Sequence, residues 1–204
     1  MKSNLKINLI IVSLLFAICI TSFSSCGKDD SIEISSMSLE ELEECVTVCD
    51  YKGLELLLDT QTKEDALVTY IYANSNIKKY PTGAVNYYAE QLKSQYRYYA
   101  DQADMKYEEM LDKLGEDNVT INAEAKRLVK KDLIFELIRK KEAIALTDEE
   151  KAQFFDKYVK KYAESYKYSE EYVRDELSEL VYDSMLYDKT IEFLIINNSF
   201  VESD

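Results

Sequence analysis

Residues 120–199 contain no proline and no glycine, and their apolar side chains recur with the 3.6-residue period of an α-helix. We predict three helical units in this stretch. The first begins with Thr120 as its N-cap and ends near residues 140–142, where cationic side chains suit a helix C-terminus. The second begins with a capping box between Thr147 and Glu150, and the third follows Ser169 and runs toward residues 197–198.

The same period identifies the side chains that these helices are expected to bury. They are Ala125, Val129, Leu133, Ile134, Leu137 and Ile138 in the first unit, Phe155, Tyr158, Val159 and Tyr162 in the second, and Val173, Leu177, Leu180, Ile191 and Ile195 in the third. Helices with such continuous apolar stripes must pack against one another, so this half of the chain is predicted to be a helical body.

An earlier helix is predicted over residues 81–103, because Pro81 suits the first position of a helix. Its apolar stripe is Val85, Tyr88, Leu92, Tyr96, Tyr99 and Ala103. Tyr87 and Tyr98 fall on nearly the opposite side of this helix, away from the stripe. A shorter helix over residues 105–114 follows, and Gly115 is expected to end it as a C-terminal cap.

Upstream, residues 45–58 alternate β-branched and polar side chains around a turn at residues 50–53. This pattern predicts a short strand pair or an extended segment. Residues 62–79 include a short helix with Ala66, Leu67, Tyr70 and Ile71 on its apolar side. We therefore assign residues 45–80 to an extended segment plus a short helix, and residues 81–204 to a helical domain.

Residues 1–25 have the pattern of a signal peptide, with lysines at positions 2 and 6, an apolar run over 9–20 and small residues before Cys26. The ending resembles the lipobox of bacterial lipoproteins, which implies that Cys26 becomes the acylated first residue. The alternative is an uncleaved membrane anchor, although the run is shorter than the roughly 20 residues of a spanning helix. Either way, we expect the body to lie outside the cytoplasm, anchored to a membrane of the cell envelope.

Residues 26–44 are polar and acidic, and we predict a tether with too little apolar content to bury. A helix over residues 38–44 is expected to be marginal.

Composition supports the helical interpretation. The chain has 204 residues, 4 glycines and 1 proline, so it has few turn formers, and we predict an all-α fold with a short extended segment near the N-terminus. The formal net charge is −14, which excludes nucleic acid as an expected partner because no basic stripe is available for phosphates.

Candidate chemistry is sparse. The chain has 0 histidines, so it has no histidine-based triad or histidine metal site. Its carboxylates fall in helix first turns or on solvated faces, and we expect no enzymatic activity, no cofactor and no metal. Cys45 and Cys49 would lie about 13 Å apart on a strand, so a disulfide between them would need a turn, and two free thiols are the alternative.

Three segments resemble the C-terminal domain of the trigger factor family. Residues 125–177 match its long helix and following junction, with the pattern of residues 133–138 leading into 141–150. Residues 189–200 match its ending, with Phe193-Leu194 and Asn197, and residues 50–56 match its D-Y-K-G-L-E-L stretch. The ribosome-binding and prolyl isomerase domains of that family have no counterpart in this chain.

The resemblance implies an elongated arm-and-cradle body that binds unfolded or secreted polypeptides without ATP. It would present weak, adaptable contacts, for which we single out Tyr87, Tyr98, Met105, Tyr182, Leu186 and Phe193 as candidate peptide-binding residues. For Tyr87 and Tyr98 the alternative is simple solvent exposure. Tyr182, Leu186 and Phe193 form a second stripe on the last helix, and for these three the alternative is that both sides of the helix are buried. A competing function is that of a surface interaction or structural lipoprotein that binds one specific partner on the same scaffold.

Overall fold

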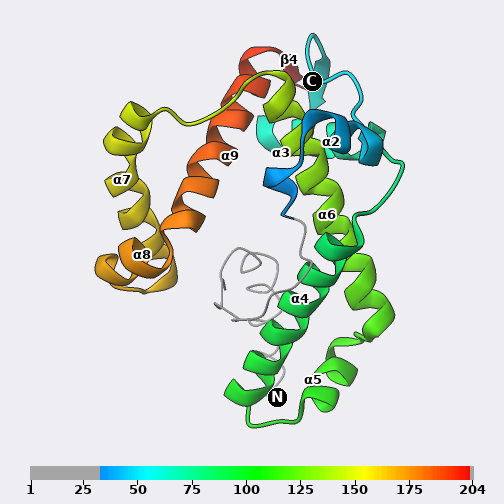
Figure 1. The fold of residues 1–204 in the computed structure, drawn as a ribbon, viewed down its shortest axis with the longest axis vertical. Coiled ribbons are helices and arrows are strands. Elements are labelled where there is room, and N and C mark those ends of the chain that lie inside the picture. The colour runs from blue at the N-terminus through cyan, green and yellow to red at the C-terminus, as the bar shows by residue number, and fades with distance from the viewer. Residues whose placement is uncertain (1–32, 203–204) are drawn as a thin grey trace. The chain divides into compact units, whose positions relative to one another are not determined.

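The structure is a computed structural model that describes residues 33–202. The predicted signal peptide, Cys26 and the first part of the tether lie outside the described residues. In chain order the elements are η1 (Ile34–Ser36), α2 (Leu39–Cys45), β1 (Val46–Thr47), β2 (Glu55–Leu58), α3 (Lys63–Asn74), β3 (Asn76–Ile77), α4 (Thr82–Gln102), α5 (Tyr107–Leu114), α6 (Asn118–Lys141), α7 (Asp148–Tyr166), α8 (Glu170–Glu176), α9 (Ser178–Ile196) and β4 (Ser199–Glu202). The prediction of an all-α fold with a short extended segment is confirmed (Figure 1).

The described chain divides into two compact units. The larger unit comprises residues 33–145 and 186–202, and the smaller unit comprises residues 146–185. The smaller unit is therefore inserted into the sequence of the larger one, and α9 contributes its first part to the smaller unit and its second part to the larger.

The larger unit is built around α6, which contacts η1, α2, α3, α4 and β1. All six side chains predicted to be buried on this helix are buried. Phe135, which was not among them, is buried as well, so that every residue from 133 to 138 except Glu136 is buried and the apolar surface extends over more than one side of the helix. A helix that is apolar on several sides is expected at the centre of a fold rather than on its surface.

The N-cap of α6 differs from our prediction. Asp117, not Thr120, is the cap, and its carboxylate accepts hydrogen bonds from the backbone N–H groups of Val119 and Thr120, each at 2.8 Å. Thr120 takes the other half of the capping box, because its Oγ1 accepts from the N–H of Asp117 at 2.7 Å. An ionised carboxylate is favoured over a hydroxyl at the positive end of the helix dipole, and these bonds lower the pKa of Asp117.

Helices α4 and α5 pack against each other, and α4 runs beside α6 (Figure 1). Pro81 is the N-cap of α4 rather than its first helical residue. Gly115 ends α5 as predicted, with φ of 70° in the left-handed region that favours glycine. The apolar side of α4 is also close to the prediction, with Val85, Leu92 and Tyr96 buried.

Two small sheets bring distant segments together. Strand β1 pairs with β3 in antiparallel fashion, with Val46 opposite Ile77. Strand β2 pairs with β4 in parallel fashion, with Glu55 opposite Ser199. The extended character of residues 45–58 was predicted, but these two partners were not.

The expectation that residues 26–44 have too little apolar content to bury is wrong for the described part of that range. Ile34, Met37 and Leu42 are buried, and α2 packs against α6. A full capping box stabilises α2, since Ser38 Oγ accepts from Glu41 N at 3.2 Å and the Glu41 carboxylate accepts from Ser38 N at 2.7 Å. The few apolar residues suffice here because α6 supplies the rest of the core.

The smaller unit consists of α7, α8 and the first part of α9. The predicted capping box of α7 is confirmed, with Thr147 N donating to Glu150 at 2.8 Å and Glu150 N donating to Thr147 Oγ1 at 3.1 Å. The core of the smaller unit consists of Val159, Tyr162, Ala163, Val173, Leu177, Val181 and Met185. The predicted third helix is not continuous, because the chain bends at Leu177 between α8 and α9. The bend lets buried residues on both sides of Leu177 join the same core.

Candidate polypeptide-binding surfaces

Helix α4 exposes two of the predicted aromatic side chains. Tyr87 is 46% exposed and Tyr98 is 58% exposed. Each ring lies edge-on to its neighbour in the sequence, Tyr87 to Tyr88 at a centroid distance of 5.6 Å and Tyr98 to Tyr99 at 5.7 Å. Exposed tyrosine rings offer apolar area together with a hydroxyl that can donate or accept a hydrogen bond.

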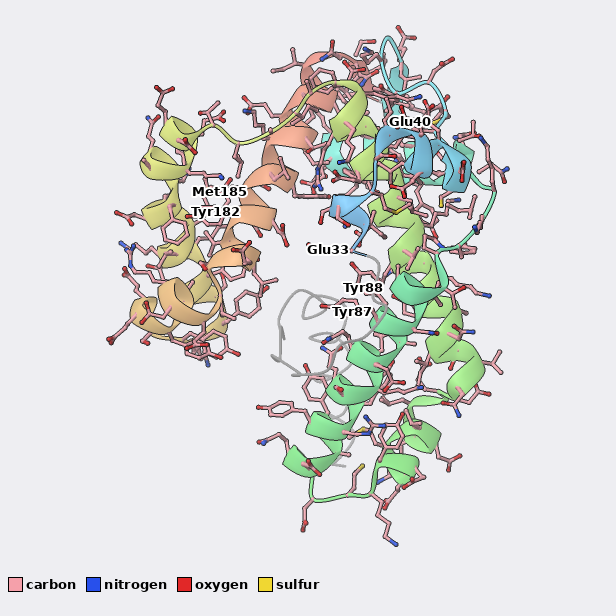
Figure 2. The ribbon with its side chains drawn as sticks, viewed as in Figure 1. Glu33, Glu40, Tyr87, Tyr88, Tyr182 and Met185 are labelled. Carbon is pink, nitrogen blue, oxygen red and sulfur yellow. The ribbon has the colours of Figure 1, made fainter. Side chains whose placement is uncertain are left out.

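The neighbouring ring, Tyr88, is held by a hydrogen bond to α6. The Tyr88 hydroxyl donates a hydrogen bond to the carboxyl group of Asp132 on α6. Burial raises the pKa of the Asp132 carboxyl, and the hydrogen bond from Tyr88 opposes this effect. Figure 2 shows Tyr87 and Tyr88 on the same stretch of α4.

The other end of α4 is anchored by Tyr96, which is buried. Burial raises the pKa of its hydroxyl to about 12, and the nearby carboxylate of Glu116 adds to the shift. Met105 follows this end of the helix and is half-buried, and its N–H donates to the carbonyl of Ala100 at 3.0 Å. The predicted residues Tyr87, Tyr98 and Met105 therefore all lie on or directly after α4, although Tyr87 and Tyr98 are three helical turns apart, about 16 Å along the axis.

The predicted second stripe on α9 is half-buried. Tyr182 packs its ring on Phe155 at 5.0 Å, and Lys151 Nζ lies 5.5 Å from the Tyr182 ring centroid. Tyr182 and Met185 project from α9 toward α7 (Figure 2). The Tyr182 ring thus contributes to the core of the smaller unit.

In the larger unit, Leu186 and Phe193 are also half-buried, and Lys52 Nζ lies 6.0 Å from the Phe193 ring centroid. These two side chains therefore offer less free area than Tyr87 and Tyr98.

The smaller unit exposes aromatic side chains that our sequence analysis missed. They are Phe154, Tyr168 and Tyr172, with the Tyr168 and Tyr172 rings 5.0 Å apart. Tyr168 follows Lys167, whose left-handed φ of 58° ends α7. Phe154 precedes the predicted stripe residue Phe155, so the helical period places it on a different side of α7 and could have identified it.

A polar clasp joins the segments of the larger unit that resemble the trigger factor family. Glu142, after the end of α6, accepts hydrogen bonds from the Tyr51 hydroxyl and from Lys52 Nζ, both at 2.6 Å. Asn198 donates from Nδ2 to the carbonyl of Tyr51 at 2.9 Å and accepts at Oδ1 from Leu54 N at 2.8 Å. The donors of Lys52 and Tyr51 lower the pKa of Glu142, whereas burial and the bond to Glu142 raise the pKa of Tyr51.

Residues 50–56 therefore bind both the end of α6 and the turn after α9. The backbone adds to the clasp, because Gly53 N donates to Asn197 O at 2.8 Å. Gly53 has φ of 72°, a left-handed conformation that favours glycine in the motif.

Sites for other chemistry are not found in the part of the chain that the structure describes. Within residues 33–202, no group of three or more His, Cys, Asp or Glu residues could hold a metal ion. Cys45 and Cys49 are free thiols, and Cys49 Sγ lies 3.8 Å from the carbonyl oxygen of Ile71. None of the described helices combines the length and apolar character that crossing a membrane requires.

These features define a helical protein with exposed aromatic surfaces. Residues 55–196 match the family described as bacterial trigger factor protein (TF) C-terminus. The match covers most of the chain, and the chain belongs to this family. Membership indicates a chaperone-like, peptide-binding role, because this domain family binds unfolded polypeptides. No curated protein matches the chain significantly. No solved structure does so either.

Proposed function

We propose that this protein is a chaperone of the cell envelope, which holds unfolded or secreted polypeptides without ATP and without a catalytic step. In this proposal a lipid on Cys26 anchors it to a bacterial membrane, and its body faces away from the cytoplasm. The observation that carries the binding role is the pair of exposed rings, Tyr87 and Tyr98, on a helix of a trigger factor C-terminal domain.

The physical basis of binding would be burial of apolar area on the client. Each square ångström of apolar surface removed from water contributes about 25 cal/mol. A few tyrosine rings spaced along a helix offer several small contacts rather than one deep pocket, so binding would be weak and tolerant of sequence. The formal net charge of −14 would help to keep the complex with an unfolded client in solution.

The binding role is tested by an aggregation assay on residues 30–204, which contain every described residue. Several chemically denatured proteins are diluted into the chain, and light scattering is followed. We expect suppression for unrelated clients and a loss of suppression in the double variant Tyr87→Ser, Tyr98→Ser. The matched control, Tyr87→Phe with Tyr98→Phe, keeps both rings and should keep most of the activity.

The result that would overturn the binding role is an absence of suppression at large molar excess, with helical content intact by circular dichroism. In that case the competing function gains support, namely that of a surface or structural lipoprotein with one specific partner. Saturable capture of a single envelope protein, lost in the serine double variant, would identify that class.

The lipid anchor is tested on the full chain produced in a bacterial host with radiolabelled palmitate. We expect label to enter the wild-type protein and not the variant Cys26→Ala. An inhibitor of the lipoprotein signal peptidase should leave a longer precursor. Equal labelling of the two chains, or no labelling of either, would refute the role of Cys26 and favour the uncleaved anchor.

A further inference from the structure

The sheet of β2 and β4 has outward-facing backbone groups. Ser199 N donates to Leu54 O at 2.9 Å, and Glu55 lies opposite Ser199 in the parallel register. In a parallel pair, alternate residues of each strand direct their N–H and C=O groups to the partner strand. Ser199 and Val201 therefore pair with β2, whereas Phe200 and Glu202 direct these groups to the outer edge of β4.

The outer edge of β4 has the features of a docking site for a further strand. Among the described residues the sheet contains two strands, and β4 packs chiefly against β2. An edge strand with outward N–H and C=O groups can accept a further strand from another polypeptide. Native edges are usually protected by charged side chains, above all lysine, by proline or by a covering element, and β4 has the sequence Ser-Phe-Val-Glu, with no lysine or proline and with Glu202 as its one charged residue.

One face of this sheet exposes apolar side chains in register. Leu57 lies opposite Val201, and these side chains are 60% and 45% exposed. The other face carries Leu56, which is buried, and Phe200, whose ring centroid lies 5.3 Å from Lys63 Nζ. A third strand on the outer edge of β4 would continue the exposed row of Leu57 and Val201, and its apolar side chains would pack beside Val201.

The charges on the strands determine which kind of segment suits this edge. Glu202 is exposed and lies on β4, on the face opposite Leu57 and Val201, whereas Glu55 lies on β2 and on the same face as Leu57. A strand added to β4 that places apolar side chains beside Val201 places its alternate side chains beside Glu202. Opposite charges on neighbouring strands are favourable and like charges are unfavourable. A segment with alternating apolar and basic residues therefore complements the sheet, whereas an acidic segment does not.

We propose that the outer edge of β4 binds an extended polypeptide segment with alternating apolar and basic residues, which adds to the sheet as a third strand. The inference rests on the proposed function, because the segment would belong to a client. It adds a second mode of binding, through backbone hydrogen bonds, to the aromatic contacts of α4.

The test measures binding of a fluorescein-labelled octapeptide of alternating valine and lysine by fluorescence anisotropy. The full chain is used in the form that the host cell produces, in a mild detergent, with detergent alone as the blank. Two isomers of the peptide carry N-methyl groups, on all valines or on all lysines. Only one of these sets can face β4, so we expect one isomer to bind at least tenfold more weakly and the other to bind within about twofold of the parent. Equal binding of the two isomers would overturn the proposal.

A pair of variants locates the site. Glu202→Pro removes an outward N–H group without changing the bonds of Val201 to β2, and an edge strand tolerates proline. Glu202→Ala removes the same carboxylate and keeps the N–H group. We expect the proline variant to bind the peptide about fivefold more weakly than the alanine variant. Equal affinities would place the peptide elsewhere and refute the site.

The remaining outcomes separate the two proposals. Suppression of aggregation together with equal binding of both isomers would refute strand addition and leave the chaperone role standing. If the chain neither suppresses aggregation nor binds the peptide, both the chaperone role and strand addition at β4 are refuted. If light scattering shows a dimer that Glu202→Pro converts to a monomer, and no peptide binds, the occupant of the edge is a second copy of the chain and the proposal is wrong.

Discussion

Replacing Asn198 by alanine should destabilise the larger unit, because this one side chain makes three hydrogen bonds to the backbone, two to residues 51–54 and one to the last turn of α9. Its Nδ2 donates to Tyr51 O at 2.9 Å and to Leu194 O at 2.6 Å, and its Oδ1 accepts from Leu54 N at 2.8 Å. At about 1 kcal/mol for each hydrogen bond, the variant should lose about 3 kcal/mol of unfolding free energy. For a chain of this size, that loss corresponds to a fall in Tm of about 6–12 °C.

The neighbouring residue provides a matched control. Asn197 is exposed, and its side chain donates to Phe193 O at 2.8 Å within the last turn of α9. Its contact with Gly53 is made by the backbone carbonyl, which the variant Asn197→Ala retains. We expect this control to cost less than about 0.5 kcal/mol. Urea unfolding followed by circular dichroism gives both values, and equal losses for the two variants would refute the clasp as described.

Three further predictions concern stability. Asp132→Asn keeps an acceptor for Tyr88, and burial raises the pKa of the Asp132 carboxyl above its unfolded value, so ionised Asp132 is unfavourable in the folded state. The asparagine variant should therefore be more stable than the wild type at pH 7.5, and urea titrations at falling pH should show this advantage shrinking; a constant advantage would contradict the reasoning. Leu42→Ala should cost about 2–5 kcal/mol in thermal unfolding, because Leu42 is 0% exposed, whereas a loose tether would lose nothing. Thr147→Ala should cost about 1 kcal/mol through the loss of its bond to Glu150 N, and the same unfolding free energy in wild type and variant would count against that cap.

Local signals in the sequence were sufficient to place most helices and their buried sides. The capping box at Thr147 and the glycine cap at Gly115 depend on neighbouring residues alone, so the sequence contains all the information that they require. The cap of α6 was misplaced because Asp117 and Thr120 both suit the position, and only geometry distinguishes the carboxylate from the hydroxyl.

Features that depend on distant parts of the chain could not be predicted from local patterns. The bend at Leu177 reflects packing on α7, and the burial of Leu42 requires the apolar surface of α6. The pairing of β2 with β4 joins Glu55 to Ser199, and no periodicity reports such a pair. For the candidate site, the helical period correctly placed Tyr87 and Tyr98 on the exposed side of α4, whereas the surface at Leu57 and Val201 exists only once that pairing is known.

The clasp has a consequence for the order in which the molecule can mature. Strand β2 and the motif at residues 50–56 leave the ribosome long before their partners, Asn198 and β4, because Leu54 and Asn198 are 144 residues apart in the sequence. The contacts between residues 50–58 and residues 197–202 therefore cannot form until the second segment has been synthesised, while the helices of residues 146–185 can already pack with one another. Because contacts between residues so far apart in sequence form slowly, we expect the pairing of residues 50–58 with residues 197–202 to limit the folding rate.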